Sequence, residues 1–212
     1  MAQSKTTYPV SLEIDYPPKS NRLTALFRIF LVIPVSLILT ILTSSVADMN
    51  ASANGETNIY SYGIIGSLFS ATAIMILFRQ RYPKWWYSFN LELNRFSARI
   101  GAYLFLLTDK YPSTEDEQSV HLNIEFPDVK KDLNRWMPLV KWFLAIPHYI
   151  ALSFLGLVAI VGTLVAWVTI LVTGKYPKEI FDFVVGVNRW SYRVLAYMFL
   201  LTTDKYPPFS LK

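Results

Sequence analysis

Long apolar runs separated by short polar segments dominate the pattern along this chain. The run from Leu26 to Val46 contains one charged residue, Arg28, whereas Ile64–Phe78 and Trp142–Gly174 contain none. A charge-free run of about 18 residues or more is typical of a helix that crosses a bilayer. The pattern therefore predicts an all-α integral membrane protein.

The chain also contains a long internal repeat. Residues 82–108 align without a gap on residues 176–202, and 14 of the 27 aligned residues are identical. Similar segments lie upstream in two further pairs: 10–17 with 120–127, and 22–34 with 135–147. A repeat on this scale indicates a duplicated structural unit.

Each unit is expected to contain a short strand, a transmembrane helical hairpin and an amphipathic interfacial helix. The first unit covers 8–112, the linker 113–118 and the second unit 119–208. Apolar and polar residues alternate at the start of each unit, as in a half-buried strand; the apolar positions are Val10, Leu12 and Ile14, then Val120, Leu122 and Ile124. Because an isolated two-stranded ribbon is marginally stable, we expect the two strands to pair and to lie on the amphipathic helices.

The transmembrane hairpin is clear in the first unit and ambiguous in the second. The first unit has spans near 28–46 and 60–78, separated by the polar loop 43–61. In the second unit, the 33 residues of 142–174 would form about 50 Å of helix, too long for one span and short for two. The repeat favours a hairpin that turns near Gly156–Gly162, which gives four crossings in all. A re-entrant segment and one long span are the alternatives.

Basic residues flank the apolar runs, and the loop 43–61 contains none. They form four groups: Lys19, Arg22 and Arg28; Arg79, Arg81 and Lys84; Lys130, Lys131, Arg135 and Lys141; Lys175 and Lys178. Cytoplasmic segments carry an excess of Lys and Arg. Both termini and the linker are therefore expected in the cytoplasm.

The segments 84–107 and 178–202 are apolar but carry a polar stripe at helical spacing. The stripe is Ser88, Glu92, Arg95 and Arg99 in the first copy, and Asp182, Gly186, Arg189 and Arg193 in the second. A charge at the bilayer centre costs about 2.5–3.5 kcal/mol, so these helices are expected along the membrane surface. Their interfacial anchors are Trp85, Trp86 and Trp190. Alternatively, these helices pack on the ends of the spans.

The arginines of this stripe are the best candidates for binding. A guanidinium group can form two parallel hydrogen bonds to one phosphate. Lipid headgroups or a partner are therefore the candidate ligands, and the candidate residues are Arg95, Arg99, Arg189 and Arg193, together with Lys84 and Lys178. Salt bridges from these arginines to Asp109, Asp204 or Glu92 are the alternative.

Little in the sequence indicates catalysis. The chain has no cysteine and two histidines, His121 and His148, and it lacks the common nucleophile, zinc-protease and nucleotide-binding motifs. We expect no metal, no cofactor and no enzymatic activity. The net charge of +5 lies beside apolar runs and fits lipid headgroups better than nucleic acid.

The second unit resembles the bacterial membrane proteins grouped as domain of unknown function 4389 (DUF4389). The resemblance is carried by Trp142-Phe-Leu-Ala-Ile-Pro-His148, Thr173-Gly-Lys-Tyr-Pro177, Phe181-Asp-Phe-Val-Val-Gly-Val-Asn-Arg-Trp190 and Leu201-Thr-Thr-Asp-Lys-Tyr-Pro-Pro-Phe209. The first unit lacks the closing Pro-Pro-Phe, so a site built from those residues would exist once. The resemblance implies residence in a membrane, which for a bacterium is the inner (plasma) membrane, and it implies no reaction.

Two functions fit these observations. The first is a non-enzymatic scaffold or accessory subunit of a larger membrane complex, with lipids and other membrane-protein subunits as partners. The second is a lipid-binding or transport protein that holds anionic headgroups at the cytoplasmic face.

Overall fold

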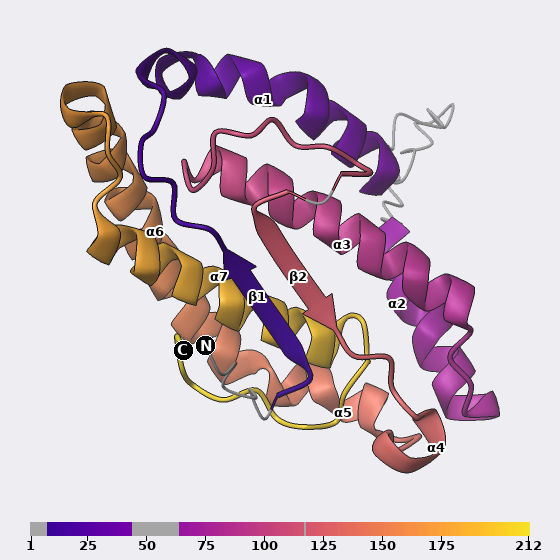
Figure 1. Ribbon diagram of the computed structural model, residues 1–212. Helices are drawn as coiled ribbons and strands as arrows, with labels where there is room; N and C mark the ends of the chain where they lie inside the picture. The colour runs from indigo at the N-terminus through magenta and orange to yellow at the C-terminus, as the bar shows by residue number, and fades with distance from the viewer. Residues whose placement is uncertain (1–7, 44–63, 117) are drawn as a thin grey trace, which may run out of the picture.

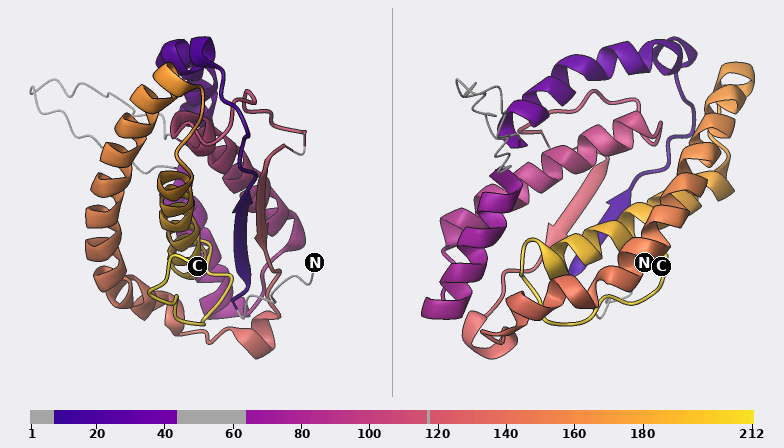
Figure 2. Two further views of the ribbon diagram at one scale, coloured as in Figure 1. Left: turned by 60° about the vertical axis from the view of Figure 1, so that its left-hand side comes forward. Right: turned by 180° about the vertical axis from the view of Figure 1, so that it is seen from behind.

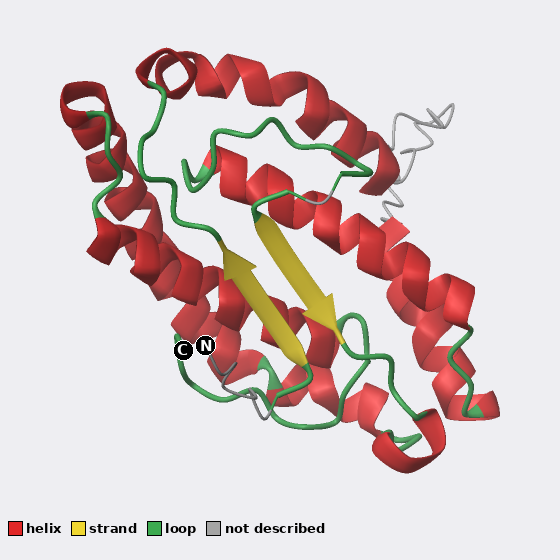
Figure 3. Ribbon diagram, in the orientation of Figure 1, coloured by secondary structure: helices red, strands yellow, loops and turns green. Residues whose placement is uncertain are grey.

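The computed structural model describes residues 8–43, 64–116 and 118–212, and it is mostly helical with a two-stranded sheet (Figure 3). The strands are β1 (Val10–Ile14) and β2 (Val120–Ile124). The helices are α1 (Arg22–Thr43), α2 (Ile64–Ile74) with the π-helical turn η1 (Met75–Arg79), α3 (Lys84–Leu104), α4 (Val129–Asp132), α5 (Met137–Leu144), α6 (Ile146–Thr173) and α7 (Lys178–Met198).

The two predicted strands form an antiparallel ribbon, with Leu12 opposite Leu122. The apolar side chains at alternate positions point inward, where they join the largest hydrophobic core. β1 lies against α7 and β2 lies against α3 (Figure 1). The predicted pairing is confirmed, and each strand covers the amphipathic helix of the other half of the chain.

The helices α3 and α7 lie in the middle of the molecule. In the left view of Figure 2, α7 separates α6 from the ribbon, and contacts between α1 and α3 and between α3 and β2 repeat this order in the other half. Both helices are shorter than the expected 84–107 and 178–202. They end near Leu106 and Leu201, which adopt left-handed backbone angles with φ of 64° and 55°, and a left-handed residue ends an α-helix.

Among the residues that the structure describes, two helices, α1 and α6, are long and apolar enough to cross a membrane. Only 22% of the most apolar stretch of each helix is buried within the protein. Most of their large apolar side chains are therefore exposed on the surface of the chain. The described part of the expected second span near 60–78 forms α2 and η1. The apolar helical stretch in this part, Leu68–Arg79, is shorter than α1 and α6. The loop 44–61 lies outside the described residues.

The hairpin predicted for 142–174 is wrong. α6 runs as one helix through both Gly156 and Gly162, and the chain bends at Ala145, between α5 and α6. A glycine inside a helix costs only about 1 kcal/mol relative to alanine. A turn between two short apolar arms would instead leave several backbone polar groups without partners in an apolar environment. Of the alternatives, the single long helix is the one observed.

Candidate functional site

A buried arginine lies near the start of α1. Arg28 is 2% exposed; its Nη1 donates to the carbonyl oxygens of Tyr103 (3.0 Å) and Thr108 (2.9 Å), and its Nη2 forms an ion pair with Asp109. The guanidinium carbon lies 4.5 Å from the centre of the Tyr103 ring. The charge is therefore held by carbonyls, a carboxylate and an aromatic face inside the protein.

A buried lysine occupies the corresponding place near the start of α5. Lys141 is 1% exposed, and its Nζ lies 2.7 Å from both the Thr203 carbonyl oxygen and Asp204 Oδ1. The Tyr197 ring centre is 5.0 Å away. Burial lowers the pKa of Lys141, while the hydrogen bond and the charge of Asp204 act against that shift.

Asp109 and Asp204 each also accept a hydrogen bond from the backbone just before the helix that carries the buried cation. Asp109 Oδ2 accepts from the backbone N–H of Asn21 (2.8 Å), and Asp204 Oδ2 accepts from that of Asn134 (2.6 Å). Sequence analysis missed both ion pairs, although the alignment places Arg28 opposite Lys141. Of the expected salt bridges of the stripe arginines, the one to Glu92 is formed, by Arg95 Nη1 at 2.6 Å. Asp109 and Asp204 pair instead with Arg28 and Lys141.

One arginine on each amphipathic helix binds an outer edge of the ribbon. Arg95 Nε donates to the Leu122 carbonyl oxygen and Arg189 Nε to the Leu12 carbonyl oxygen, both at 3.0 Å. Leu12 and Leu122 face each other across the ribbon, so the two arginines hold opposite strands. Edge carbonyls that would otherwise be open to pairing are thereby satisfied.

The second arginine of each helix holds the chain that follows the helix. Arg99 Nη1 donates to the Ser113 carbonyl oxygen (2.9 Å), and Arg193 donates to the carbonyls of Ser210 (3.1 Å) and Lys212. The Nε atoms of both arginines are buried without a hydrogen-bond partner. Burial, followed by the charge of Arg189, lowers the pKa of Arg193.

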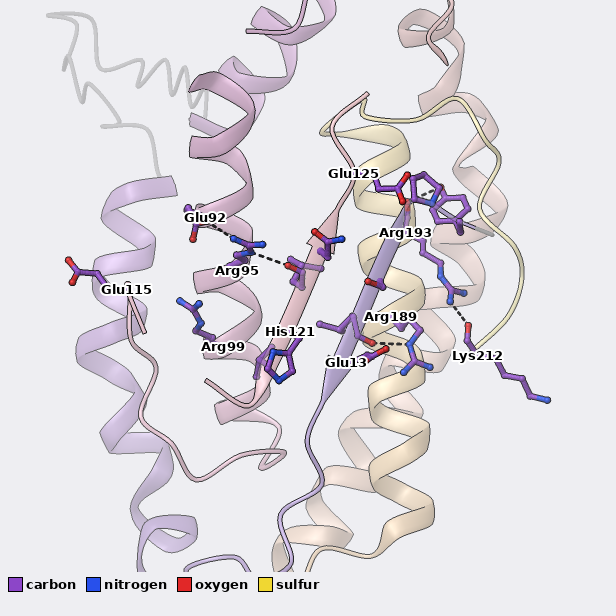
Figure 4. Close-up of a pocket in the computed structure, with 17 residues that line it drawn as sticks. Glu13, Glu92, Arg95, Arg99, Glu115, His121, Glu125, Arg189, Arg193 and Lys212 are labelled. Atoms are coloured by element: carbon purple, nitrogen blue, oxygen red, sulfur yellow. Dashed lines mark hydrogen bonds and ion pairs between the residues drawn. The ribbon is translucent and has the colours of Figure 1, made fainter. Parts of the chain in front are cut away.

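All four arginines line one groove of about 1120 Å³ on the ribbon side of the protein. In Figure 4 they lie on both sides of the ribbon, Arg95 and Arg99 on α3, and Arg189 and Arg193 on α7. Four glutamates share the groove: Glu13, Glu92, Glu115 and Glu125. The groove is thus of mixed charge, which weakens its attraction for a simple anion.

The two candidate lysines lie outside this groove. Lys84 is exposed. Lys178 lies 3.9 Å from Asp182 on its own helix, and 5.1 Å from the centre of the Tyr16 ring. The structure therefore brings the four arginines together and leaves both lysines elsewhere.

The three predicted aromatic anchors differ in exposure. Trp85 is 68% exposed, whereas Trp86 is half-buried and its Nε1 donates to Thr72 Oγ1 at 2.9 Å. Trp190 is only 5% exposed, and its Nε1 donates to His148 Nδ1 at 3.1 Å. The prediction that Trp190 is an interfacial anchor is wrong, because the packing of α6 and the C-terminal tail on α7 covers this residue.

The residues that carry the family resemblance meet around His148. This histidine is fully buried; the Phe209 ring stacks on it at 4.1 Å and the Tyr206 ring centre lies 4.7 Å away. His121 is far from this cluster in the chain, on β2, and lies 3.5 Å from Asp15. Within the described residues, no group of three or more His, Cys, Asp or Glu side chains could hold a metal ion.

Comparison with known proteins identifies one relationship. No curated protein and no solved structure matches the chain. Residues 135–210, which contain α5, α6, α7 and the cluster around His148, match the family model described as domain of unknown function (DUF4389). The resemblance to this family that the sequence suggests is thereby confirmed over residues 135–210.

Proposed function

We propose that the protein is a non-enzymatic integral membrane protein that serves as a scaffold or accessory subunit of a larger membrane complex. The observation that carries the proposal is an inverted distribution of polarity. Arg28 in α1 and Lys141 in α5 are buried, and most large apolar side chains of α1, α5 and α6 are exposed. Water-soluble proteins show the opposite arrangement, whereas lipid favours it.

A core helix of a soluble protein passes the same test of length and composition as a membrane span. Such a helix, however, is mostly buried, and α1 and α6 are not. Their exposed apolar side chains form a continuous surface along each helix. A monomeric soluble protein rarely exposes a contiguous apolar patch of more than a few hundred Å². The exposed apolar surfaces of α1 and α6 therefore favour contact with lipid or with another membrane subunit, as the proposal requires.

The duplicated sequence is also part of the proposal. In our view, two copies of one unit exchange their strands, since β1 lies on α7 and β2 lies on α3. The matching ion pairs Arg28–Asp109 and Lys141–Asp204 support this view. Such an exchange would tie the two halves into one rigid body that presents a polar groove beside apolar helices, as expected of a scaffold.

We further propose that both termini face the cytoplasm of a bacterial cell. Because α6 is one helix, this topology has two crossings, both in the first unit, and keeps both ends of α6 on the cytoplasmic side. The chain has no cysteine, so single cysteines at Ser52, Ser113 and Lys212 can be probed with an impermeant thiol reagent in intact cells. Labelling at Ser52 alone supports this topology. Labelling at Ser113 or Lys212 overturns it.

A second candidate function is the binding of anionic lipid headgroups. It is favoured by the unpartnered, buried Nε atoms of Arg99 and Arg193 beside the groove. Against it, the four arginines donate to carbonyls of the chain itself, and four glutamates lie nearby. We therefore rank it below the scaffold.

Purification from native membranes in mild detergent, followed by mass spectrometry, tests both candidates. The scaffold predicts other membrane proteins at fixed stoichiometry. Headgroup binding predicts bound anionic phospholipid without such partners. Recovery of the protein in the soluble fraction, or of a lone chain with neither lipid nor partner, contradicts both.

A further inference from the structure

Two segments at equivalent positions of the repeat bury a charged side chain and expose apolar ones. In the first, the buried positions are Ala25, Arg28, Val32 and Val35; in the second they are Pro138, Lys141, Ala145 and His148. The spacing of three, four and three residues is that of one helical face. In both segments this inward face carries a cation.

The outward faces of the same segments are apolar. Between Leu23 and Ile33 the exposed residues include Phe27, Ile29 and Phe30. Between Trp136 and Ile146 they include Leu139, Trp142 and Phe143. Ile29 and Trp142, which the alignment places opposite each other, are 70% and 54% exposed. Neither outward face contains a charged side chain that is exposed.

Exposed basic residues border both faces. Lys130 and Lys131 precede the second segment, and Arg135 Nη2 donates to Gln80 Oε1 (2.9 Å), beside Arg79 and Arg81. At the first segment, Arg22 Nη2 donates to the Val172 carbonyl oxygen (2.9 Å), and the Ser20 backbone N–H donates to the Gly174 carbonyl oxygen (2.9 Å). The exposed residues Lys19 and Lys175 are the chain neighbours of Ser20 and Gly174. Each apolar face therefore begins at a basic group, the arrangement that binds the headgroup region of an anionic membrane.

We infer that Leu23–Ile33 and Trp136–Ile146 are two equivalent lipid-contact surfaces that lie at the boundary between headgroups and acyl chains of a bilayer containing anionic lipid. Trp136 and Trp142 lie at headgroup depth, where tryptophan is enriched. The two surfaces lie at opposite ends of the protein, at the top and bottom of Figure 1. They fix the depth and tilt of the protein, and the middle of α6 lies deeper. The inference rests on the proposed residence in a membrane.

Water and protein are the other possible neighbours of these surfaces. Water is disfavoured because removing large apolar side chains from water is favourable. A protein neighbour would exclude both polar and apolar small molecules from the surface. The three environments therefore differ in a measurable way.

Spin labels on single cysteines in the full-length chain test the inference. We propose Ile29→Cys and Trp142→Cys as the test variants, Val161→Cys on the exposed side of α6 as the deep reference, and Lys131→Cys in the basic group as the shallow, water-accessible reference; all four side chains are exposed. The proteins are reconstituted into vesicles of phosphatidylcholine and phosphatidylglycerol. The ratio of collision rates with oxygen and with a water-soluble nickel complex reports depth.

We expect the ratios at positions 29 and 142 to agree with each other and to fall between those at 131 and 161. Ratios equal to that at 131, with position 161 deep, overturn the inference but leave membrane residence intact. Ratios as high as that at 161 also overturn it, because the surfaces would then lie in the acyl core. Low collision rates with both reagents would indicate a protein neighbour and would overturn it as well. A water-like ratio at 161 contradicts the proposed function itself.

Discussion

Lys141 Nζ lies 2.7 Å from Asp204 Oδ1, in a site that leaves only 1% of the lysine exposed. The same arrangement holds Arg28 against Asp109 in the other half of the chain. In both halves the aspartate also binds the backbone N–H of an asparagine that precedes the helix. A single carboxylate thus fixes a buried cation and the start of an apolar helix. Loss of either charged partner would leave the other charge buried and unpaired, with a large desolvation penalty.

We expect Lys141→Met to destabilise the protein by about 3–5 kcal/mol, the usual cost of leaving one member of a buried ion pair without its partner. The exposed pair Lys178–Asp182 provides the control, since Lys178→Met should change stability by about 0–1 kcal/mol. Thermal unfolding of both variants in neutral detergent measures the difference. Equal stability of the two variants would show that Asp204 does not depend on Lys141.

The glycine at position 186 is expected to be essential for docking of the C-terminal tail. A Cβ added to Gly186 would lie 2.8 Å from both the Cβ and the carbonyl oxygen of Leu211. The tail is held there by Arg189 and Arg193. Gly186→Val should therefore displace the tail and cost about 1–3 kcal/mol.

The matched control for this substitution is Gly156→Ala in α6, where an added Cβ meets no atom within 4 Å. This change should stabilise the protein by about 0.5–1 kcal/mol, because alanine is the better helix former. Limited proteolysis of the tail, together with thermal unfolding, distinguishes the two variants. An intact, protected tail in Gly186→Val would contradict the prediction.

The hydrogen bond from Trp190 to His148 should make Trp190 more sensitive to substitution than the other tryptophans on the amphipathic helices. Trp190→Phe leaves the buried His148 Nδ1 without its donor, at a cost of about 1–3 kcal/mol. Trp85→Phe, at an exposed position, should change stability by less than about 0.5 kcal/mol. Thermal unfolding of the two variants side by side provides the comparison, and a larger loss for Trp85→Phe would refute it.

The elements predicted well are those whose patterns are local. Alternation between apolar and polar residues located both strands to the residue, and the polar stripe located α3 and α7 except for their last turn. The course of 142–174 was not predictable in this way, because this run has no charged residue or proline near Gly156–Gly162 to mark or exclude a turn. The expectation of equal hairpins came from the repeat, and the two units differ at this point.

The buried ion pairs escaped sequence analysis for a related reason. Arg28 and Asp109 are 81 residues apart, and a single cation beside an apolar run has the same appearance whether it faces water or the protein interior. Trp190 likewise belongs to an apolar helix face, which indicates burial but not whether lipid or protein provides it. Protein buries Trp190, because α6 and the C-terminal tail pack on α7 at this position.

Two measurements distinguish a binding role of the stripe arginines from a role in stability. Sequence analysis predicts that replacing Arg95, Arg99, Arg189 and Arg193 with glutamine weakens association with lipid or a partner more than folding. Their bonds to carbonyls of the ribbon and of the following segments predict that each loss also lowers stability, by about 1.5–3 kcal/mol where a charged hydrogen bond is removed. Thermal unfolding and retained lipid or partner are measured on the same samples.

The control for this experiment is the double variant Lys84→Gln and Lys178→Gln, which lies outside the groove. A quadruple variant that unfolds readily, while the wild type retains neither anionic lipid nor partner, would show that the arginines are internal braces. A quadruple variant of normal stability that loses a bound component would support binding.

Alkaline pH should destabilise the protein through its buried tyrosines. Burial, followed by the charge of Asp204, raises the pKa of Tyr197 from its usual value of 10.0 to about 12. A group with a raised folded-state pKa contributes stability that is complete below its unfolded pKa and is lost as the pH rises through the folded one. The stability should therefore fall between about pH 10 and 12, and Tyr197 alone accounts for at most about 2–3 kcal/mol of that fall. Tyr197→Phe should make the fall shallower, whereas Tyr111→Phe, at an exposed position, should leave the slope almost unchanged. Unfolding free energies of the three proteins, measured in detergent from pH 8 to pH 12, provide the test, and parallel curves for wild type and Tyr197→Phe would mean that the Tyr197 hydroxyl ionises equally well in the folded and unfolded states.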